Sequence, residues 1–216
     1  MIRLRYLFFS IVASFSAVCV ASDATEQLKL FSKTTKSASG EFIQQQVVVQ
    51  ADGQIKVIKE LTGNFLFLRP GKFVWETTKP YEQKMLADGK QLMMWDKDLN
   101  QVTYRKADQA LAATPAAILF GDTNVEQYFT LKNTLQNNDL EWVELIPKTN
   151  EAKQNDIPYS KIGIGMANHL PQAMELRDNF GNVVLLRFKN IKTNISITPS
   201  DFIFKAPAGT DIVKLP

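Results

Sequence analysis

The sequence predicts a mainly β protein, in which an antiparallel sheet carries a few packed helices. Short runs rich in β-branched and aromatic residues recur at regular intervals along most of the 216 residues. Clusters of Gly, Pro, Asn and Asp separate these runs, and only two stretches carry the apolar spacing of a helix. Many short strands in succession indicate an antiparallel meander within one domain.

The first helical pattern spans residues 25–37. Leu28, Leu30 and Phe31 are the apolar residues of this stretch, and Lys29, Lys33 and Lys36 are polar ones. Gly40 follows the pattern and ends it. We therefore expect one amphipathic helix that packs on a larger element.

Seven β-rich runs follow the first helix. They span residues 41–50, 55–61, 63–68, 72–77, 84–87, 92–95 and 101–104. The Asp88-Gly89 pair between two of these runs is a hairpin signal, because Gly accepts a positive φ at no steric cost.

A second helical pattern interrupts the strands at residues 108–120. Thr114 and Pro115 are typical of a helix N-cap followed by Pro at the first helical position, and Gly121 closes the pattern. Six further strands are expected after it, at residues 125–132, 140–147, 159–166, 172–177, 183–189 and 201–205.

The first 21 residues differ from the rest. Arg3 and Arg5 precede an apolar run from Leu7 to Val20, which is shorter than the roughly 20 apolar residues that span a membrane. A charged start, an apolar middle and small residues that allow cleavage after Ala21 or Ser22 are typical of a secretory signal peptide. We expect residues 1–21 to be the signal and residues 22–216 to form a single domain.

Cys19 is the only cysteine and would leave with the signal, so no disulfide or thiol chemistry is expected afterwards. Ser16 and Val18 disagree with a bacterial lipid-attachment site at Cys19, which usually has Leu three residues before the Cys and a small residue just before it. Removing two of the 25 basic residues leaves 23 against 22 acidic ones, a net charge of +1. This balance, without a basic cluster, argues against a nucleic-acid partner.

Aromatic residues and one arginine fall on a single strand face. Residues two apart in a strand point the same way, so Phe65, Phe67 and Arg69 share a face, and Phe73 shares one with Trp75. Two interpretations stay open. The rings fill an ordinary core with the arginine at its rim, or they line the concave face of a curved sheet that binds an apolar ligand beneath a helical lid.

Residue types needed for common enzyme sites are scarce. His169 is the only histidine, and the sequence holds neither G-x-S-x-G nor a P-loop. Metal sites that need several His or Cys ligands are excluded by count, and no cofactor motif occurs. Carboxylate pairs such as Asp96 and Asp98 leave glycoside chemistry open, although a solvated turn explains them better. We expect a protein that is not an enzyme, with no catalytic, metal or cofactor site.

The most specific signal lies between Leu61 and Trp75, where Arg69, Pro70, Phe73 and Trp75 form an Arg-Pro-x-x-Phe-x-Trp motif. This segment resembles the outer-membrane lipoprotein carrier protein family, known as LolA. Agreement continues in order at Pro80, Asp88-Gly89, Leu92 with Trp95, residues 101–103, Thr114-Pro115 and residues 202–209. The resemblance covers nearly the whole chain after the signal.

The resemblance implies an unclosed antiparallel β-barrel, covered by a helical lid over a hydrophobic cavity. It further implies a monomeric periplasmic carrier that takes acylated lipoproteins from an inner-membrane ABC transporter to an outer-membrane receptor. A lipoprotein-sensing domain or a binding protein for small apolar ligands with the same fold remains the alternative. Arg69 matches the family's lid latch. The expected cavity residues are Phe42, Phe65, Phe67, Phe73, Trp75, Ile118 and Leu119.

Overall fold

The computed structural model describes residues 23–50, 52–106, 119, 125–127, 129–137, 139–148 and 159–215. These residues form one helix of three turns, two short 3-10 helices and twelve strands. The helices are α1 (Ala24–Thr34), η2 (Val125–Gln127) and η3 (Pro199–Phe202). The strands are β1 (Ser37–Val49), β2 (Ile55–Leu68), β3 (Lys72–Lys79), β4 (Gln83–Asp88), β5 (Gln91–Asp96), β6 (Gln101–Lys106), β7 (Phe129–Asn137), β8 (Leu140–Pro147), β9 (Tyr159–Ala167), β10 (Leu170–Asp178), β11 (Val183–Thr193) and β12 (Asp211–Lys214).

All twelve strands belong to one sheet, in the order β12-β6-β5-β4-β3-β2-β1-β11-β10-β9-β8-β7. Neighbours pair antiparallel except β12, which runs parallel to β6. The two ends of this order, β12 and β7, are not paired with each other, so the sheet is curved but unclosed. The predicted mainly β, unclosed architecture is therefore confirmed.

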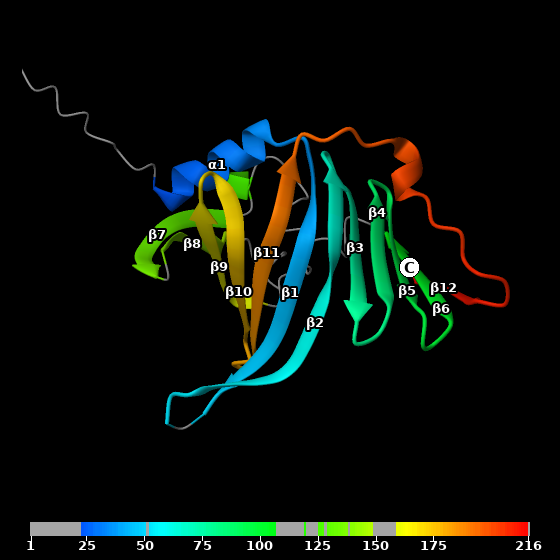
Figure 1. Cartoon of the computed structure of the whole chain (residues 1–216), viewed down its shortest axis with the longest axis horizontal. Helices are drawn as coiled ribbons and strands as arrows, with labels where there is room; N and C mark the ends of the chain where they lie inside the picture. Colours follow the sequence, from blue (N-terminus) through cyan, green and yellow to red (C-terminus); the bar gives the residue numbers. More distant parts are fainter. Residues whose placement is uncertain are drawn as a thin grey trace, which may run out of the picture.

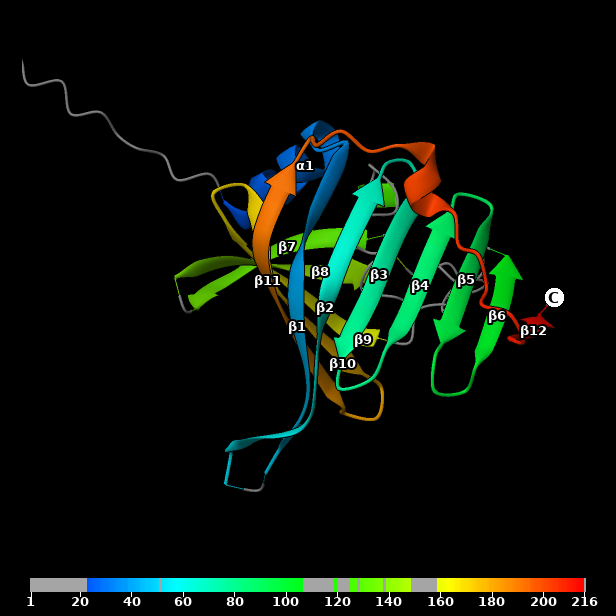
Figure 2. The same ribbon diagram turned by 45° about the vertical axis from the view of Figure 1, so that its right-hand side comes forward.

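The sheet curls so that its two halves face each other. In Figure 2, β7, β8 and β9 run behind β2 and β3 and cross them at a steep angle. The main core lies between these walls and combines residues from both, including Phe67 and Phe73 on one side and Val143 and Ile162 on the other. A smaller cluster around Leu86 is formed with the C-terminal segment.

Helix α1 lies along the upper end of the walls, beside β7–β10 (Figure 1). It begins after Asp23, whose carboxylate accepts a hydrogen bond from the backbone N–H of Glu26 at 2.9 Å, a standard N-cap. The predicted amphipathic helix is confirmed, because Leu28 and Phe31 are buried in the main core. Leu30, however, is 42% exposed, and the helix ends at Thr34, so that Gly40 lies within β1 and does not end the helix. Among the described residues, no helix is long and apolar enough to cross a membrane.

Three strand predictions need correction. The runs predicted at 55–61 and 63–68 form one strand, β2, because Gly63 sits at an irregularity in the ladder and does not end it. The strand predicted at 125–132 begins only at Phe129, after the turn of η2. Residues 201–205 form no strand, since the backbone N–H of Thr198 donates to the Asp201 carboxylate and opens η3 instead. The second predicted helix lies outside the described residues, apart from Leu119.

Gly63 allows the close approach of β2 and β3. A Cβ added there would lie 1.9 Å from the Glu76 carbonyl oxygen and 2.7 Å from the Phe42 ring. We expect Gly63→Ala to lower the free energy of unfolding by about 3 kcal/mol or more, because backbone cannot yield to this overlap. Urea unfolding measures the change. Gly163→Ala is the matched control, because its Cβ would meet Trp142 at an ordinary 3.4 Å, and an equal loss in both variants would contradict the prediction.

Candidate functional site

The predicted aromatic face forms one continuous surface inside the sheet. Cross-strand pairing places Phe65 opposite Trp75 and Phe67 opposite Phe73, which confirms that the four rings share a face. Phe42 joins them from β1. All five side chains are buried, with exposed fractions between 0% and 8%. The alternate residues Leu66 and Leu68 are only partly buried, as the two-residue period predicts.

The rings pack against one another. Phe42 stacks on Trp75 with ring centroids 3.9 Å apart, and Phe65 lies parallel to Trp75 at 6.3 Å. Phe188 of β11 meets Phe65 edge to face at 5.8 Å. These contacts occupy the space between the walls with side chains. A ligand that enters between these rings would have to separate them.

Two of the predicted cavity residues belong to residues 108–120, the second stretch predicted as a helix. Leu119 is buried in the main core with an exposed fraction of 2%, in the same cluster as the aromatic rings. Ile118 lies outside the described residues. Leu119 therefore belongs to the aromatic interior.

Arg69 joins three parts of the molecule. It follows β2, and its backbone N–H donates to the Lys36 carbonyl at 2.8 Å. Its side-chain Nε donates to the carbonyl of Thr35, the C-cap of α1, at 3.1 Å. Its Nη2 donates to the Leu119 carbonyl at 2.8 Å. The guanidinium thus ties the end of β2 to α1 and to Leu119.

Electrostatics favour the guanidinium in this position. The last turn of a helix leaves carbonyls without intrahelical partners and carries a partial negative charge, so a cation at the Thr35 carbonyl is stabilised. The guanidinium also lies over the Phe67 ring at 5.1 Å and the Phe31 ring at 5.7 Å, where cation–π attraction adds to the hydrogen bonds. The same rings belong to the buried interior, so Arg69 sits at its rim.

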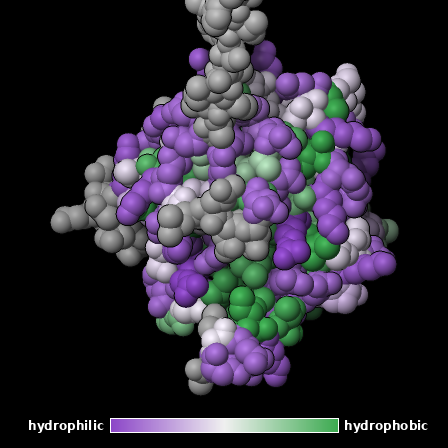
Figure 3. All heavy atoms as spheres, turned by 60° about the vertical axis from the view of Figure 1, so that its left-hand side comes forward, coloured by the Kyte–Doolittle hydropathy of each residue, from purple (hydrophilic) through white to green (hydrophobic). Residues whose placement is uncertain are grey.

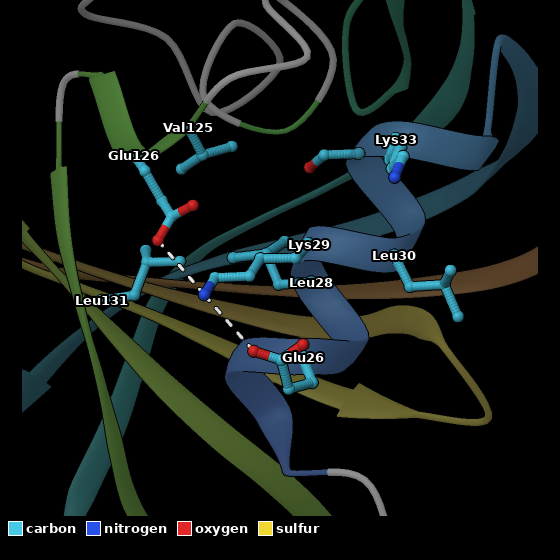
Figure 4. Close-up of a pocket in the computed structure, with 9 residues that line it drawn as sticks. Glu26, Leu28, Lys29, Leu30, Lys33, Val125, Glu126 and Leu131 are labelled. Atoms are coloured by element: carbon cyan, nitrogen blue, oxygen red, sulfur yellow. Dashed lines mark hydrogen bonds and ion pairs between the residues drawn. The ribbon is translucent and has the colours of Figure 1, made fainter.

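A second link connects α1 to η2 on the outer surface. The Lys29 ammonium lies 3.2 Å from Glu126 and 3.3 Å from Glu26, and these carboxylates raise its pKa above the ordinary value (Figure 4). Both ion pairs are largely exposed, so each contributes little. Beside them lies a groove of about 600 Å³ whose apolar walls include Leu28 and Leu131.

The first turns of α1 are fixed to the opposite wall. Gln27 donates from Nε2 to the Glu141 carboxylate of β8 at 2.7 Å and accepts from the backbone N–H of His169 at 2.9 Å. His169 is exposed in the turn between β9 and β10, and it contacts α1 through its backbone. Helix α1 therefore spans both walls, held by Gln27 at one end and by Arg69 at the other.

These features define a class of protein. It has a single curved antiparallel sheet that is open along one side, an aromatic interior between its two walls, and a helix and an arginine that close the upper rim.

Comparison with known proteins gives the family. Residues 33–205 match the family model described as outer membrane lipoprotein carrier protein LolA. The outer-membrane lipoprotein carrier protein of Cupriavidus pinatubonensis is 48% identical over 191 residues, which cover 88% of this chain and 87% of that protein. The carrier protein of Ralstonia nicotianae is 43% identical over 204 residues, covering 94% and 92%. The chain belongs to the LolA family.

A solved structure agrees at the level of the fold. The crystal structure of an uncharacterized conserved protein from Thermus thermophilus superposes with a TM-score of 0.55 at 12% identity. The match covers 89% of this chain and 99% of that one. At this identity the likeness supports the sheet architecture and nothing about the ligand.

Proposed function

We propose that this protein is a periplasmic carrier that holds the acyl chains of lipoproteins between the walls of its sheet. It receives them after release from the inner membrane by an ABC transporter and passes them to a receptor at the outer membrane. The observation that carries the proposal is the aromatic interior whose rim Arg69 closes through the Thr35 and Leu119 carbonyls. No chemical step and no cofactor is involved.

Energetics explain why such a carrier needs a latch. Each acyl CH₂ removed from water contributes about 0.8 kcal/mol, so one long chain contributes on the order of 10 kcal/mol. Several chains would exceed the practical affinity ceiling near 20 kcal/mol, and the cargo would not be released. Opening must therefore cost free energy that offsets part of this gain.

The contacts of Arg69 supply a cost of suitable size. Charge-assisted hydrogen bonds contribute roughly 1.5–3 kcal/mol each, and opening the rim would break those to Thr35 and Leu119. The stacked rings must separate as well. The open, loaded state would then be strained relative to the closed, empty one, and transfer to a receptor would run downhill.

Export to the periplasm is part of the proposal. Residues 1–21 would act as the signal peptide, leaving residues 22–216 as a single monomeric carrier domain. Intact-mass measurement of protein recovered from the periplasm is expected to give the chain that begins at Ser22. A mass that includes the first 21 residues would contradict this part.

The decisive experiment is mass spectrometry of protein purified without detergent from its native periplasm. Triacylated lipoproteins are expected to co-purify and to move to a purified outer-membrane receptor. Free fatty acid alone would favour a binding protein for small apolar ligands. Lipoprotein that binds but is never donated would favour a sensing domain of the same fold.

A further inference from the structure

The hairpin formed by β1 and β2 projects beyond the rest of the sheet (Figures 1 and 2). The ladder between β1 and β11 ends at Val47, and the ladder between β2 and β3 ends at Thr62. Past these points the two strands pair only with each other, as far as the described residues extend. We call this part, residues 48–61, the arm.

One edge of the arm is an open strand edge. From Ile55 to Leu61, β2 has β1 on one side and, within the described part of the chain, no strand on the other. Alternate residues of a paired strand direct their N–H and C=O groups away from the partner, so about half of these backbone groups point outward. These seven residues at about 3.3 Å each give an edge of roughly 23 Å, with an extra residue, Ile58, where the register with β1 shifts, and this is long enough for a whole added strand.

Several side chains along this edge are both apolar and exposed to solvent. Every residue from Ile55 to Glu60 is exposed, and the exposed fraction is 62% for Ile55, 46% for Val57 and 52% for Ile58. Figure 3 views the molecule from the side on which the arm projects and shows an apolar area next to its polar end. Proteins normally shorten, bend or cover such edges, because they template pairing with another chain.

The edge is also cationic. Lys56 and Lys59 lie along it, and the Lys59 ammonium rests over the Tyr81 ring, 4.8 Å from the ring centroid. The one carboxylate of this run, on Glu60, accepts a hydrogen bond from Gln45 of β1 at 2.6 Å and is thereby directed toward the paired side. A partner strand would therefore meet two lysine charges among apolar side chains.

We propose that the arm is a docking edge for an extended polypeptide segment of a partner, which adds as a strand to β2 and carries acidic residues between apolar ones. This inference goes beyond the carrier role and does not depend on it. Backbone hydrogen bonds would align the added strand with β2. The apolar contact would come from Ile55, Val57 and Ile58, and the selectivity for carboxylates would come from Lys56 and Lys59.

The tip of the arm favours a polypeptide over a lipid surface. The described turn residues include polar Asp52 and Gln54, with the Asp52 carboxylate accepting from the Gln54 backbone N–H at 2.9 Å and Gly53 at a φ of +81°. Any insertion into a bilayer would have to bury this polar tip first, because the apolar residues lie behind it. Strand addition along the edge leaves the tip in water.

The test uses the full chain and a synthetic peptide of eight residues that alternates valine and glutamate, with blocked ends. In an NMR titration we expect amide shifts and slowed hydrogen exchange at residues 55–60, and none on β7, one of the two end strands of the sheet. The double variant Lys56→Glu/Lys59→Glu is expected to weaken binding at least tenfold. Lys132→Glu on β7 is the matched control and is expected to leave binding unchanged, since Lys132 is an exposed strand lysine.

Two altered peptides test the mechanism of binding. A peptide methylated at alternate backbone nitrogens cannot form the ladder and is expected to lose binding, and a peptide with lysine in place of glutamate is expected not to bind. Equal binding of the methylated peptide would overturn strand addition. Absence of peptide binding would also overturn the proposal, whether the chain instead self-associates in sedimentation experiments or co-sediments with phosphatidylglycerol vesicles.

Discussion

Replacing Arg69 with leucine is expected to leave lipoprotein binding intact and to reduce transfer to the receptor at least tenfold. Leucine keeps apolar contact with Phe31 and Phe67 but donates no hydrogen bond to the Thr35 and Leu119 carbonyls. Loss of even one charge-assisted bond of about 1.5 kcal/mol corresponds to a tenfold change in an equilibrium constant. A transfer assay with the purified variant, loaded with lipoprotein, and purified receptor measures the effect.

Two further variants make this result specific. Arg69→Lys keeps the charge but not the fork of donors, so it is expected to transfer at an intermediate level. Arg187→Leu removes an exposed arginine of β11 and is expected to transfer normally. Normal transfer by Arg69→Leu would refute the role of Arg69 as a latch.

Replacing Phe42 with alanine is expected to destabilise the empty protein by about 3–5 kcal/mol while strengthening its response to ligand. The Phe42 ring is buried and stacks on Trp75 at 3.9 Å, so its removal leaves a cavity. An acyl chain that enters between the walls would fill this cavity instead of displacing the ring. The expected result is a lower Tm without ligand and a larger rise in Tm when a long-chain fatty acid is added as the probe.

The control for this experiment lies in the second apolar cluster. Leu86→Ala also removes a buried side chain, but from the cluster around Met93 and Val102, away from the aromatic interior. It is expected to lower Tm without enlarging the response to fatty acid. If both variants respond alike, the aromatic interior is an ordinary core and the cavity hypothesis fails.

Sequence patterns predicted the sheet and its aromatic face well because both follow from short-range periodicity. The two-residue period placed Phe65 and Phe67 on one face, and the cross-strand register then aligned them with Trp75 and Phe73. The position of Arg69 at the rim of that face follows from the same parity. Its importance, however, was suggested by the family motif and not by periodicity.

Features that depend on distant backbone atoms could not be predicted. The partners of Arg69 are the carbonyls of Thr35 and Leu119, and every residue type offers a carbonyl, so no sequence signal marks them. The links of α1 to β8 through Gln27 and to η2 through Lys29 depend in the same way on the tertiary structure. Strand β12 was missed because four residues paired parallel to β6 leave no local pattern.

The wrong strand prediction at residues 201–205 could have been avoided from the local sequence. Thr198 followed by Pro199 and, three residues after the cap, by Asp201 is a helix-start signal, and the structure forms η3 there. The apolar residues Phe202 and Phe204 favoured a strand instead. Capping chemistry outweighed alternation over this short stretch, because the Asp201 carboxylate pairs with the Thr198 backbone N–H at 2.8 Å.

The unpaired ends of the sheet have a mechanical consequence. A closed barrel has a circumference fixed by its strand number and stagger, so its bore cannot change without breaking a ladder. Here β7 and β12 are separate ends of the sheet, so the radius of curvature of the sheet can increase through a small change in the coiling of each strand. The curved sheet can therefore widen or narrow elastically to match the volume of a bound ligand, while the interstrand hydrogen bonds stay intact.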